Sequence, residues 1–288
     1  MAALALIATP LAAQPVKPPT PYDRAIAAGY KALTLCSAMF VAGRTQAQVE
    51  ALELTGTYPE YDALLPTLTA TADRTSRSVA VPFDPAMPLR FADYHTATGC
   101  TLHPIGSEPQ RAVWTSELPP SQTPPDAPWP IGDNVVTPRP GKPLSAAIDI
   151  AFPATGPRTT GVVVVADGRI VAERYADGFG PFTSNRTWSV AKSLTGTLIG
   201  AAVQQQAVRV EDRADIPEWA GPQRTAPSVQ RDAEPDPRSR ITIDNLVRMA
   251  SGLYGATAGN RTDAVYFGGA TVTETATAEP LITEPGTR

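Results

Sequence analysis

The stretch TWSVAKSLTGTLIG, residues 187–200, places Ser189 three positions ahead of Lys192 at the start of a predicted helix. Residues three apart lie on one face of an α-helix, so the two side chains can meet. A serine hydroxyl is a weak nucleophile at neutral pH and needs a nearby base, which the amine of Lys192 could supply. The free amides and positive dipole end of a first helical turn would stabilise an oxyanion. The pair therefore indicates acyl transfer.

The residues that follow the pair predict a buried helix. Val190, Leu194 and Leu198 recur at four-residue intervals and form an apolar stripe. We therefore expect the helix to pack into a core with Lys192 partly buried, where desolvation would lower the pKa of the lysine until it can accept a proton. The alternative is an ordinary helix that Ser189 caps and from which a solvated Lys192 projects, because Ser-x-x-Lys alone is a weak pattern.

A β-hairpin is predicted ahead of this helix. Residues 159–178, TTGVVVVADGRIVAERYADG, contain two β-rich runs separated by Asp167 and Gly168. An Asp-Gly pair between such runs is a strong hairpin signal, because both residues tolerate the positive φ that a tight turn requires. A helical stretch, residues 144–152, precedes the hairpin.

Another helix is predicted further along the chain. Residues 240–255, RITIDNLVRMASGLYG, follow a loop or short-strand segment over residues 208–219. Thr242 is a suitable N-cap because its hydroxyl can accept a bond from a free amide of the first turn. Gly252 is the predicted end of the helix, since glycine readily adopts the left-handed conformation that terminates one.

Together, these segments resemble the active-site region of the β-lactamase-related serine hydrolases, which include penicillin-binding proteins, class C β-lactamases, esterases and 6-aminohexanoate-dimer hydrolases. The strongest likeness is to the esterase and aminohexanoate-dimer hydrolase branch, in which W-S-x-A-K-S-x-T begins the catalytic helix. The matching stretches follow the order of the family and are ERYADGFGPFTSNRTWSVAKSLTGTLIGAAV (173–203), IPEW (216–219), ITIDNLVRMASGL (241–253), VYFGG (265–269) and AEPLITEPGTR (278–288).

The resemblance implies an α+β fold of the serine β-lactamase/transpeptidase type, with an antiparallel sheet flanked by helices. It implies that Ser189 is the acylated nucleophile and Lys192 its activating partner in the hydrolysis of a small-molecule ester or amide. The likeness around W-S-x-A-K-S favours esters and linear amides over β-lactams. No metal or organic cofactor is implied.

Two motifs of the family are absent from the sequence. None of the eight tyrosines is followed two residues later by asparagine, as in Tyr-x-Asn, and no Lys-Thr-Gly or His-Thr-Gly follows the serine. In the family a Pro-Gly-Thr-like stretch leads into Tyr-x-Asn, and this sequence ends in PGTR, residues 285–288. We therefore expect a C-terminally truncated fragment with an incomplete fold and little activity. Reading the coding DNA past codon 288 would test this expectation.

Two other classes of function stay open at this point. A non-catalytic secreted binding or interaction protein, derived from the β-lactamase-like fold, would keep the serine helix as a packing element. A structural secreted protein would be built around the proline-rich residues 116–143. Replacement of Ser189 separates these alternatives from the enzyme, because only the enzyme requires its hydroxyl.

The N-terminus predicts export. MAALALIATPLAAQP, residues 1–15, is a short apolar run that ends in small residues, as in a secretory signal peptide cleaved between Ala13 and Gln14. We therefore expect residues 1–13 to be removed and the protein to be periplasmic or secreted. The alternative is a disordered apolar N-terminus.

Two cysteines and two histidines complete the candidate residues. Cys36 and Cys100 are the only cysteines, and in an exported protein they are expected to form one disulfide rather than to remain two buried thiols. His95 and His103 are accompanied by no HExxH or CxxC motif, so we predict surface or hydrogen-bonded structural histidines and no metal site.

Composition divides the chain and excludes some partners. Residues 116–143 contain nine prolines and read as a linker or arm between residues 14–115, of unknown role, and the predicted N-terminal portion of the hydrolase domain, residues 144–288. A net charge of −4 gives no reason to expect nucleic acid as a partner. No stretch reaches the roughly 18 apolar residues of a membrane span. The sequence does not predict an oligomeric state.

Overall fold

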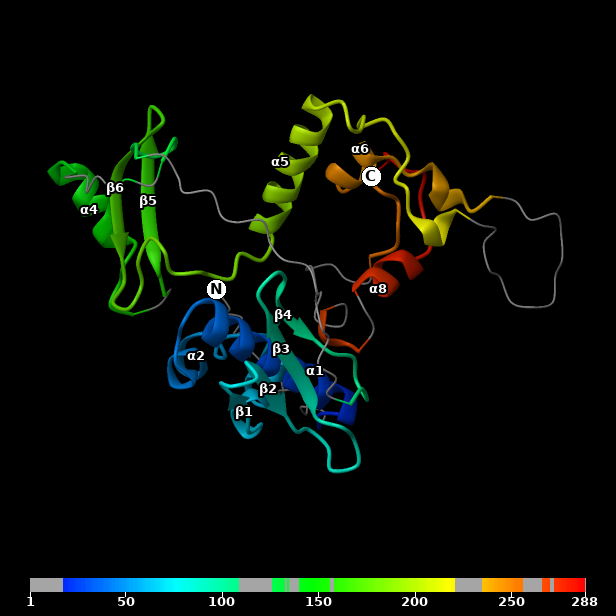
Figure 1. The fold of residues 1–288 in the computed structure, drawn as a ribbon, viewed down its shortest axis with the longest axis horizontal. Helices are drawn as coiled ribbons and strands as arrows, with labels where there is room; N and C mark the ends of the chain where they lie inside the picture. The colour runs from blue at the N-terminus through cyan, green and yellow to red at the C-terminus, as the bar shows by residue number, and fades with distance from the viewer. Residues whose placement is uncertain are drawn as a thin grey trace, which may run out of the picture.

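The computed structural model of the 288-residue chain describes residues 18–108, 126–132, 134, 140–155, 158–220, 235–255, 266–269 and 272–287, without the side chains of residues 272 and 273. The predicted signal peptide and most of the predicted linker lie outside these ranges. The described residues form an N-terminal domain, residues 18–108, and a second part that contains the predicted serine helix (Figure 1). Both parts combine helices with antiparallel strands, which makes the fold α+β. No helix in the described part is long and apolar enough to cross a membrane.

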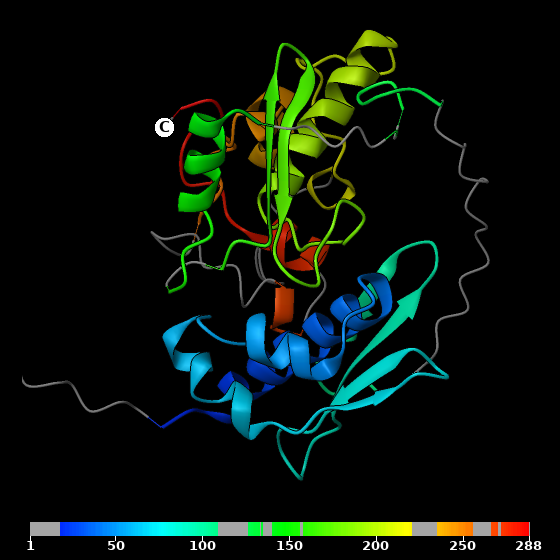
Figure 2. The same cartoon turned by 90° about the vertical axis from the view of Figure 1, so that its left-hand side faces the viewer.

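The N-terminal domain packs one long helix against a four-stranded sheet (Figure 2). The strands follow one another in the order β1-β2-β3-β4, and every neighbouring pair is antiparallel. Ala27 and Ala28 of the helix and Val79 and Ala92 of the sheet are completely buried, so the contact between the two layers is the core of the domain. The elements are α1 (Pro21–Cys36), a π-helix (Ser37–Val41), α2 (Gln46–Leu52), α3 (Pro59–Asp62), a 3-10 turn (Leu65–Thr67), β1 (Thr71–Asp73), β2 (Ser78–Val81), β3 (Arg90–His95) and β4 (Gly99–Leu102).

Local signals in the sequence set the ends of the first two helices. Thr45 caps α2, because its hydroxyl accepts from the amide of Gln48 and the Gln48 side chain accepts from the amide of Thr45. Helix α1 is α-helical to Cys36, where the chain continues as the π-helix. Gly43 follows with a φ of 68°, a left-handed conformation that stops the helix.

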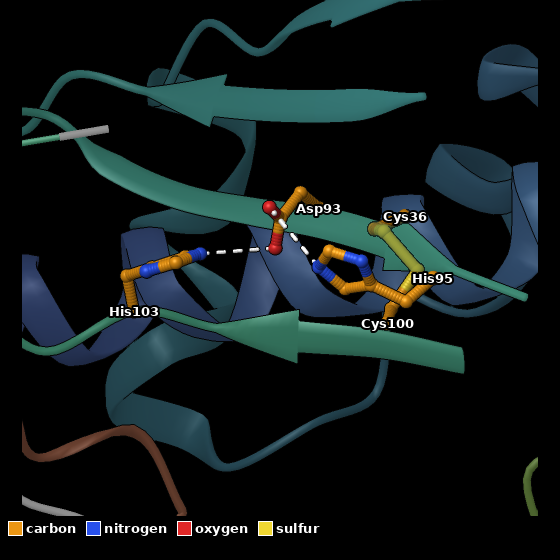
Figure 3. Close-up of a disulfide and its surroundings, with 5 residues drawn as sticks. All are labelled: Cys36, Asp93, His95, Cys100 and His103. Carbon is orange, nitrogen blue, oxygen red and sulfur yellow. Dashed lines mark hydrogen bonds and ion pairs between the residues drawn. A yellow bond between two sulfur atoms is a disulfide. The ribbon is translucent and has the colours of Figure 1, made fainter. Parts of the chain in front are cut away.

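A disulfide joins the end of α1 to β4 (Figure 3). Cys36 and Cys100 are bonded, with their Cα atoms 6.0 Å apart. Beside them, the buried carboxylate of Asp93 lies between two imidazoles, with His103 Nε2 2.9 Å from Oδ1 and His95 Nε2 3.3 Å from Oδ2. Both histidines therefore contact a buried structural carboxylate. Within the described ranges, no group of three or more side chains could hold a metal ion.

The second part begins with a helix and the hairpin expected from the sequence. The turn residues Asp167 and Gly168 have φ values of 49° and 69°, as a tight hairpin turn requires, and the flanking strands pair antiparallel. Helix α4 lies against the hairpin, where Ile148 and Ala172 are buried. The elements of this part are α4 (Lys142–Ile150), β5 (Gly161–Ala166), β6 (Arg169–Tyr175), α5 (Val190–Gln204), a 3-10 turn (Pro217–Trp219), a 3-10 turn (Pro237–Arg240), α6 (Ile243–Val247) and α8 (Val272–Ala278).

The helix predicted over residues 240–255 is much shorter in the structure. Thr242 does cap it, since its hydroxyl accepts from the amide of Asn245. However, α6 ends at Val247 and not at Gly252, so the predicted end is wrong. The physical reason is pairing with the end of the chain, because the carbonyl of Gly252 accepts bonds from the amides of residues 282 and 283. A helix would leave no room for this extended pairing.

One buried ion pair holds the second 3-10 turn against the end of α8. Arg238 donates from Nε to Asp236 Oδ1 at 3.0 Å and from Nη2 to Oδ2 at 2.6 Å. Its Nη1 donates to the carbonyls of Thr277 and Glu279, and the indole of Trp219 also donates to the carbonyl of Thr277. The pair satisfies a carboxylate that is only 1% exposed, so this contact should respond to acid.

Acid is expected to weaken this part of the fold through Asp236. The pKa of Asp236 lies below its usual range because Arg238 donates hydrogen bonds to the carboxylate. An unfolded aspartate has a pKa of about 3.9, so the stabilisation is complete above about pH 4 and is lost as pH falls through the lower folded-state pKa. As the pH drops below about 4, the unfolding free energy of Asp236→Asn should therefore fall less steeply than that of the wild type.

Urea unfolding followed by tryptophan fluorescence measures this effect. No tryptophan lies within residues 18–108, so the fluorescence change reports the rest of the chain. Asp62→Asn is the control, because the Asp62 carboxylate accepts bonds from Thr57 within the N-terminal domain. An acid dependence in Asp236→Asn as steep as in the wild type would contradict the prediction.

Candidate active site

The predicted nucleophile and its partner meet at the start of α5. Lys192 Nζ donates a hydrogen bond to Ser189 Oγ across 2.8 Å. Ser189 is the residue immediately before the helix and has a helical backbone conformation, with φ −67° and ψ −9°. The i, i+3 spacing therefore brings the hydroxyl and the amine into direct contact. Both residues are exposed.

The first turn of α5 is tight. The amides of Val190, Ala191 and Lys192 each donate to the carbonyl three residues earlier, at 3.0 or 3.1 Å. These three amides are therefore engaged, and the expectation that the first-turn amides are free is wrong for them. The amide of Ser189 is not one of these three amides. Trp188, immediately before it, has a φ of 45°, which bulky residues rarely adopt.

The burial predicted for this helix is absent in the structure. Val190 is 61% exposed, Leu194 59% and Leu198 70%, and no residue of α5 is buried. Lys192 is exposed as well, so its predicted partial burial is wrong. The four-residue period correctly identified an apolar stripe, but a stripe is buried only where another layer covers it. Among the described residues no such layer packs on α5.

A cleft of about 1320 Å³ opens beside Ser189 and Lys192. Its walls come from α5, α6 and the N-terminal domain, and most of the lining side chains are apolar. Two charged side chains, Arg186 and Lys192, line it, and both are cationic. The cleft could therefore accept an apolar group next to the hydroxyl. The apolar walls include Leu198 of α5, Leu246 of α6, and Leu33 and Tyr58 of the N-terminal domain.

The family comparison identifies the part of the chain that carries this pair. Residues 151–288 match the family model described as Beta-lactamase. The match supports a β-lactamase-related serine hydrolase superfamily for this part of the chain. The β-lactamase-family domain, residues 151–288, includes the hairpin β5–β6, helix α5 and both residues of the pair. No curated protein and no solved structure matches the chain.

The family match supports a serine hydrolase in general, and with it a small-molecule substrate. The structure adds residues at the site that the sequence did not single out. Arg186, Tyr266 and Phe267 line the cleft with the pair, and Arg186 and Phe267 also contact the N-terminal domain. The sequence signal for them was weak, since it consisted only of their positions within stretches that resemble the family.

Proposed function

We propose that the β-lactamase-family domain hydrolyses a small ester or amide through an acyl-enzyme at Ser189. The observation that carries the proposal is the 2.8 Å contact between Lys192 Nζ and Ser189 Oγ at the first turn of α5. A nucleophile and base within hydrogen-bonding reach are the minimum arrangement for covalent catalysis by a hydroxyl. The family match supports the same chemistry from the sequence.

The proposed reaction has two halves. Ser189 Oγ attacks the carbonyl carbon of the substrate while Lys192, in its neutral form, takes the hydroxyl proton. The tetrahedral intermediate collapses, the alcohol or amine leaves with that proton, and the acyl group stays on Oγ. Water then adds to the acyl carbon and gives up a proton as the bond to Oγ breaks, which releases a carboxylic acid and restores the serine.

Two features support esters and linear amides over β-lactams as substrates. One is the W-S-x-A-K-S stretch, residues 188–193, which resembles the esterase branch of the family. The other is the largely apolar lining of the cleft beside the pair. The disulfide supports the proposed export, because disulfides persist in oxidising compartments.

We also propose that the 288-residue chain turns substrate over slowly. Tyr-x-Asn and Lys-Thr-Gly are absent from its sequence, and the pair is exposed to water. Catalytic parts act as a unit, so a site without some of them loses several orders of magnitude in rate. Acylation by a reactive probe requires less of the site than full turnover, and it is therefore the suitable first measurement.

The test is covalent labelling with a fluorophosphonate, followed by mass spectrometry of the modified peptide. We expect label on Ser189 in the wild type and none at this position in Ser189→Ala. Ser193→Ala is the matched control, because Ser193 is an exposed serine one turn further along the same helix. It should label like the wild type.

The alternative function is a non-catalytic binding protein. The exposed apolar stripe of α5 favours it, since such a surface suits a contact with another molecule. Labelling that is absent from the wild type, or that Ser189→Ala does not alter, would support this alternative and refute the hydrolase.

A further inference from the structure

Five side chains form a closed circuit of contacts that joins the N-terminal domain to the segment before Ser189. The Arg186 guanidinium lies 5.3 Å from the ring centroids of both Tyr30 and Trp188. Trp188 contacts Tyr266 edge to face, with ring centroids 6.3 Å apart, and Tyr266 lies 6.2 Å from Phe267. Phe267 contacts Tyr30 at 5.1 Å and closes the circuit. We call these five residues the aromatic circuit.

The circuit is anchored on α1 by hydrogen bonds. Arg186 Nη1 donates to Tyr30 Oη at 3.1 Å, and its Nη2 donates to Thr34 Oγ1. Tyr30 and Thr34 are 7% and 0% exposed, so both acceptors are fixed within the N-terminal core. Arg186 itself is exposed, but its guanidinium group bonds to this rigid surface. A planar guanidinium that makes two hydrogen bonds and stacks on rings is well suited to hold one geometry.

Phe267, on the other side of the circuit, is also held by the N-terminal domain. Phe267 is 3% exposed and belongs to the hydrophobic core of the N-terminal domain, although it lies far away in the sequence. The buried Arg90 donates to the carbonyl of Phe267 at 2.8 Å and to that of Ala25, in α1, at 3.2 Å. In Figure 2 the orange segment that contains residues 266–269 lies directly on the blue helix α1.

The circuit ends at the residue that precedes the nucleophile. Trp188 is adjacent to Ser189, and its carbonyl accepts the amide of Ala191 in the first turn of α5. Its φ of 45° is strained for a bulky residue, and such a conformation persists only where the surroundings hold it. Contacts with Arg186 and Tyr266 supply those surroundings.

We propose that the N-terminal domain contributes to the active site, because α1 fixes the backbone that carries Ser189. Arg186 is the positioning residue in this arrangement. This inference rests on the proposed function, and it assigns a role to residues 18–108 that the family match does not cover. Arg186 does not act on the substrate. It acts through Trp188, by holding the turn from which the nucleophile projects.

The experiment compares the wild type with Arg186→Gln and Arg186→Lys in the full chain. Hydrogen–deuterium exchange of a peptide spanning residues 184–192 measures how firmly the segment is held, whether or not the protein is an enzyme. The rate of fluorophosphonate labelling of Ser189 measures the consequence for the nucleophile. Arg169→Gln, at an exposed arginine of β6, is the matched control.

We expect exchange in this peptide to become about 10-fold faster in Arg186→Gln and labelling to become about 10-fold slower, since a small misplacement of a reacting group has large kinetic effects. Exchange in α1 should stay as in the wild type, which shows that the N-terminal domain is folded. Arg186→Lys should recover part of both effects, because an ammonium group can replace one of the two hydrogen bonds. Arg169→Gln should match the wild type.

Unchanged exchange in Arg186→Gln would overturn the inference, whatever the labelling shows. Faster exchange with an unchanged labelling rate would also overturn it, because the contact would then hold the chain without positioning the nucleophile. A wild type that takes no label at Ser189 would instead refute the proposed hydrolase, and with it the role in catalysis. The failure of the inference alone is therefore distinguishable from the failure of the function.

Discussion

Removal of the disulfide between Cys36 and Cys100 is expected to lower the unfolding free energy of the N-terminal domain by about 4 kcal/mol. The two cysteines are 64 residues apart, so the bond closes a long loop and restricts the unfolded chain strongly. It also joins two layers of the fold, since Cys36 ends α1 and Cys100 lies in β4. A loss of this size is a large fraction of the stability of a small domain.

Urea unfolding followed by far-ultraviolet circular dichroism, with and without reductant, measures the effect. The double variant Cys36→Ala, Cys100→Ala should unfold at lower urea than the oxidised wild type and close to the reduced wild type. Reduction leaves the volumes of both side chains almost unchanged, so this comparison separates the covalent link from packing. Equal urea midpoints for the oxidised and reduced wild type would show that the link contributes nothing.

Local features of the fold could be predicted from the sequence. The turn at Asp167 and Gly168 and the cap at Thr242 each depend on residues within a few positions of one another. The contact of Ser189 with Lys192 is local for the same reason, because helical geometry alone brings residues three apart together. These features need no knowledge of the distant chain.

Features that depend on distant segments could not be predicted. The end of α6 at Val247 is set by pairing between residue 252 and residues 282–283, which helix signals do not report. The exposure of Leu194 and Leu198 depends on whether another layer covers α5, and periodicity alone cannot decide that. In each case the local signal was real, and the outcome depended on whether a segment far away in the sequence packs against it.

The same limit applies to the candidate site. Phe267 lies in the core of the N-terminal domain, whose other buried hydrophobic residues come from residues 25–92. No pattern in the sequence around Phe267 indicates this contact. Nothing in the sequence distinguishes Arg186 from other arginines in loops. Only the fold places its guanidinium against Tyr30 and Thr34. The contact between Ser189 and Lys192 was therefore predictable from the sequence, but the surface against which this segment packs was not.

Replacement of Lys192 by methionine is expected to slow the labelling of Ser189 by about 10³-fold, within the range that a general base contributes. This factor corresponds to about 4 kcal/mol of activation free energy. Methionine keeps most of the length of the side chain but offers no nitrogen to accept the hydroxyl proton. Lys142→Met is the matched control, because Lys142 is an exposed lysine at the start of α4, and it should label at the wild-type rate.

A second substitution separates proton transfer from charge. Lys192→Arg keeps a cation that can reach Ser189 Oγ, but a guanidinium stays protonated at any usable pH and cannot act as a base. If Lys192 accepts the proton, the arginine variant should label as slowly as the methionine variant. Labelling at the wild-type rate in Lys192→Arg would assign Lys192 an electrostatic role instead. Because arginine and methionine both remove the base but only methionine removes the charge, the two rates together identify which property of Lys192 activates the serine.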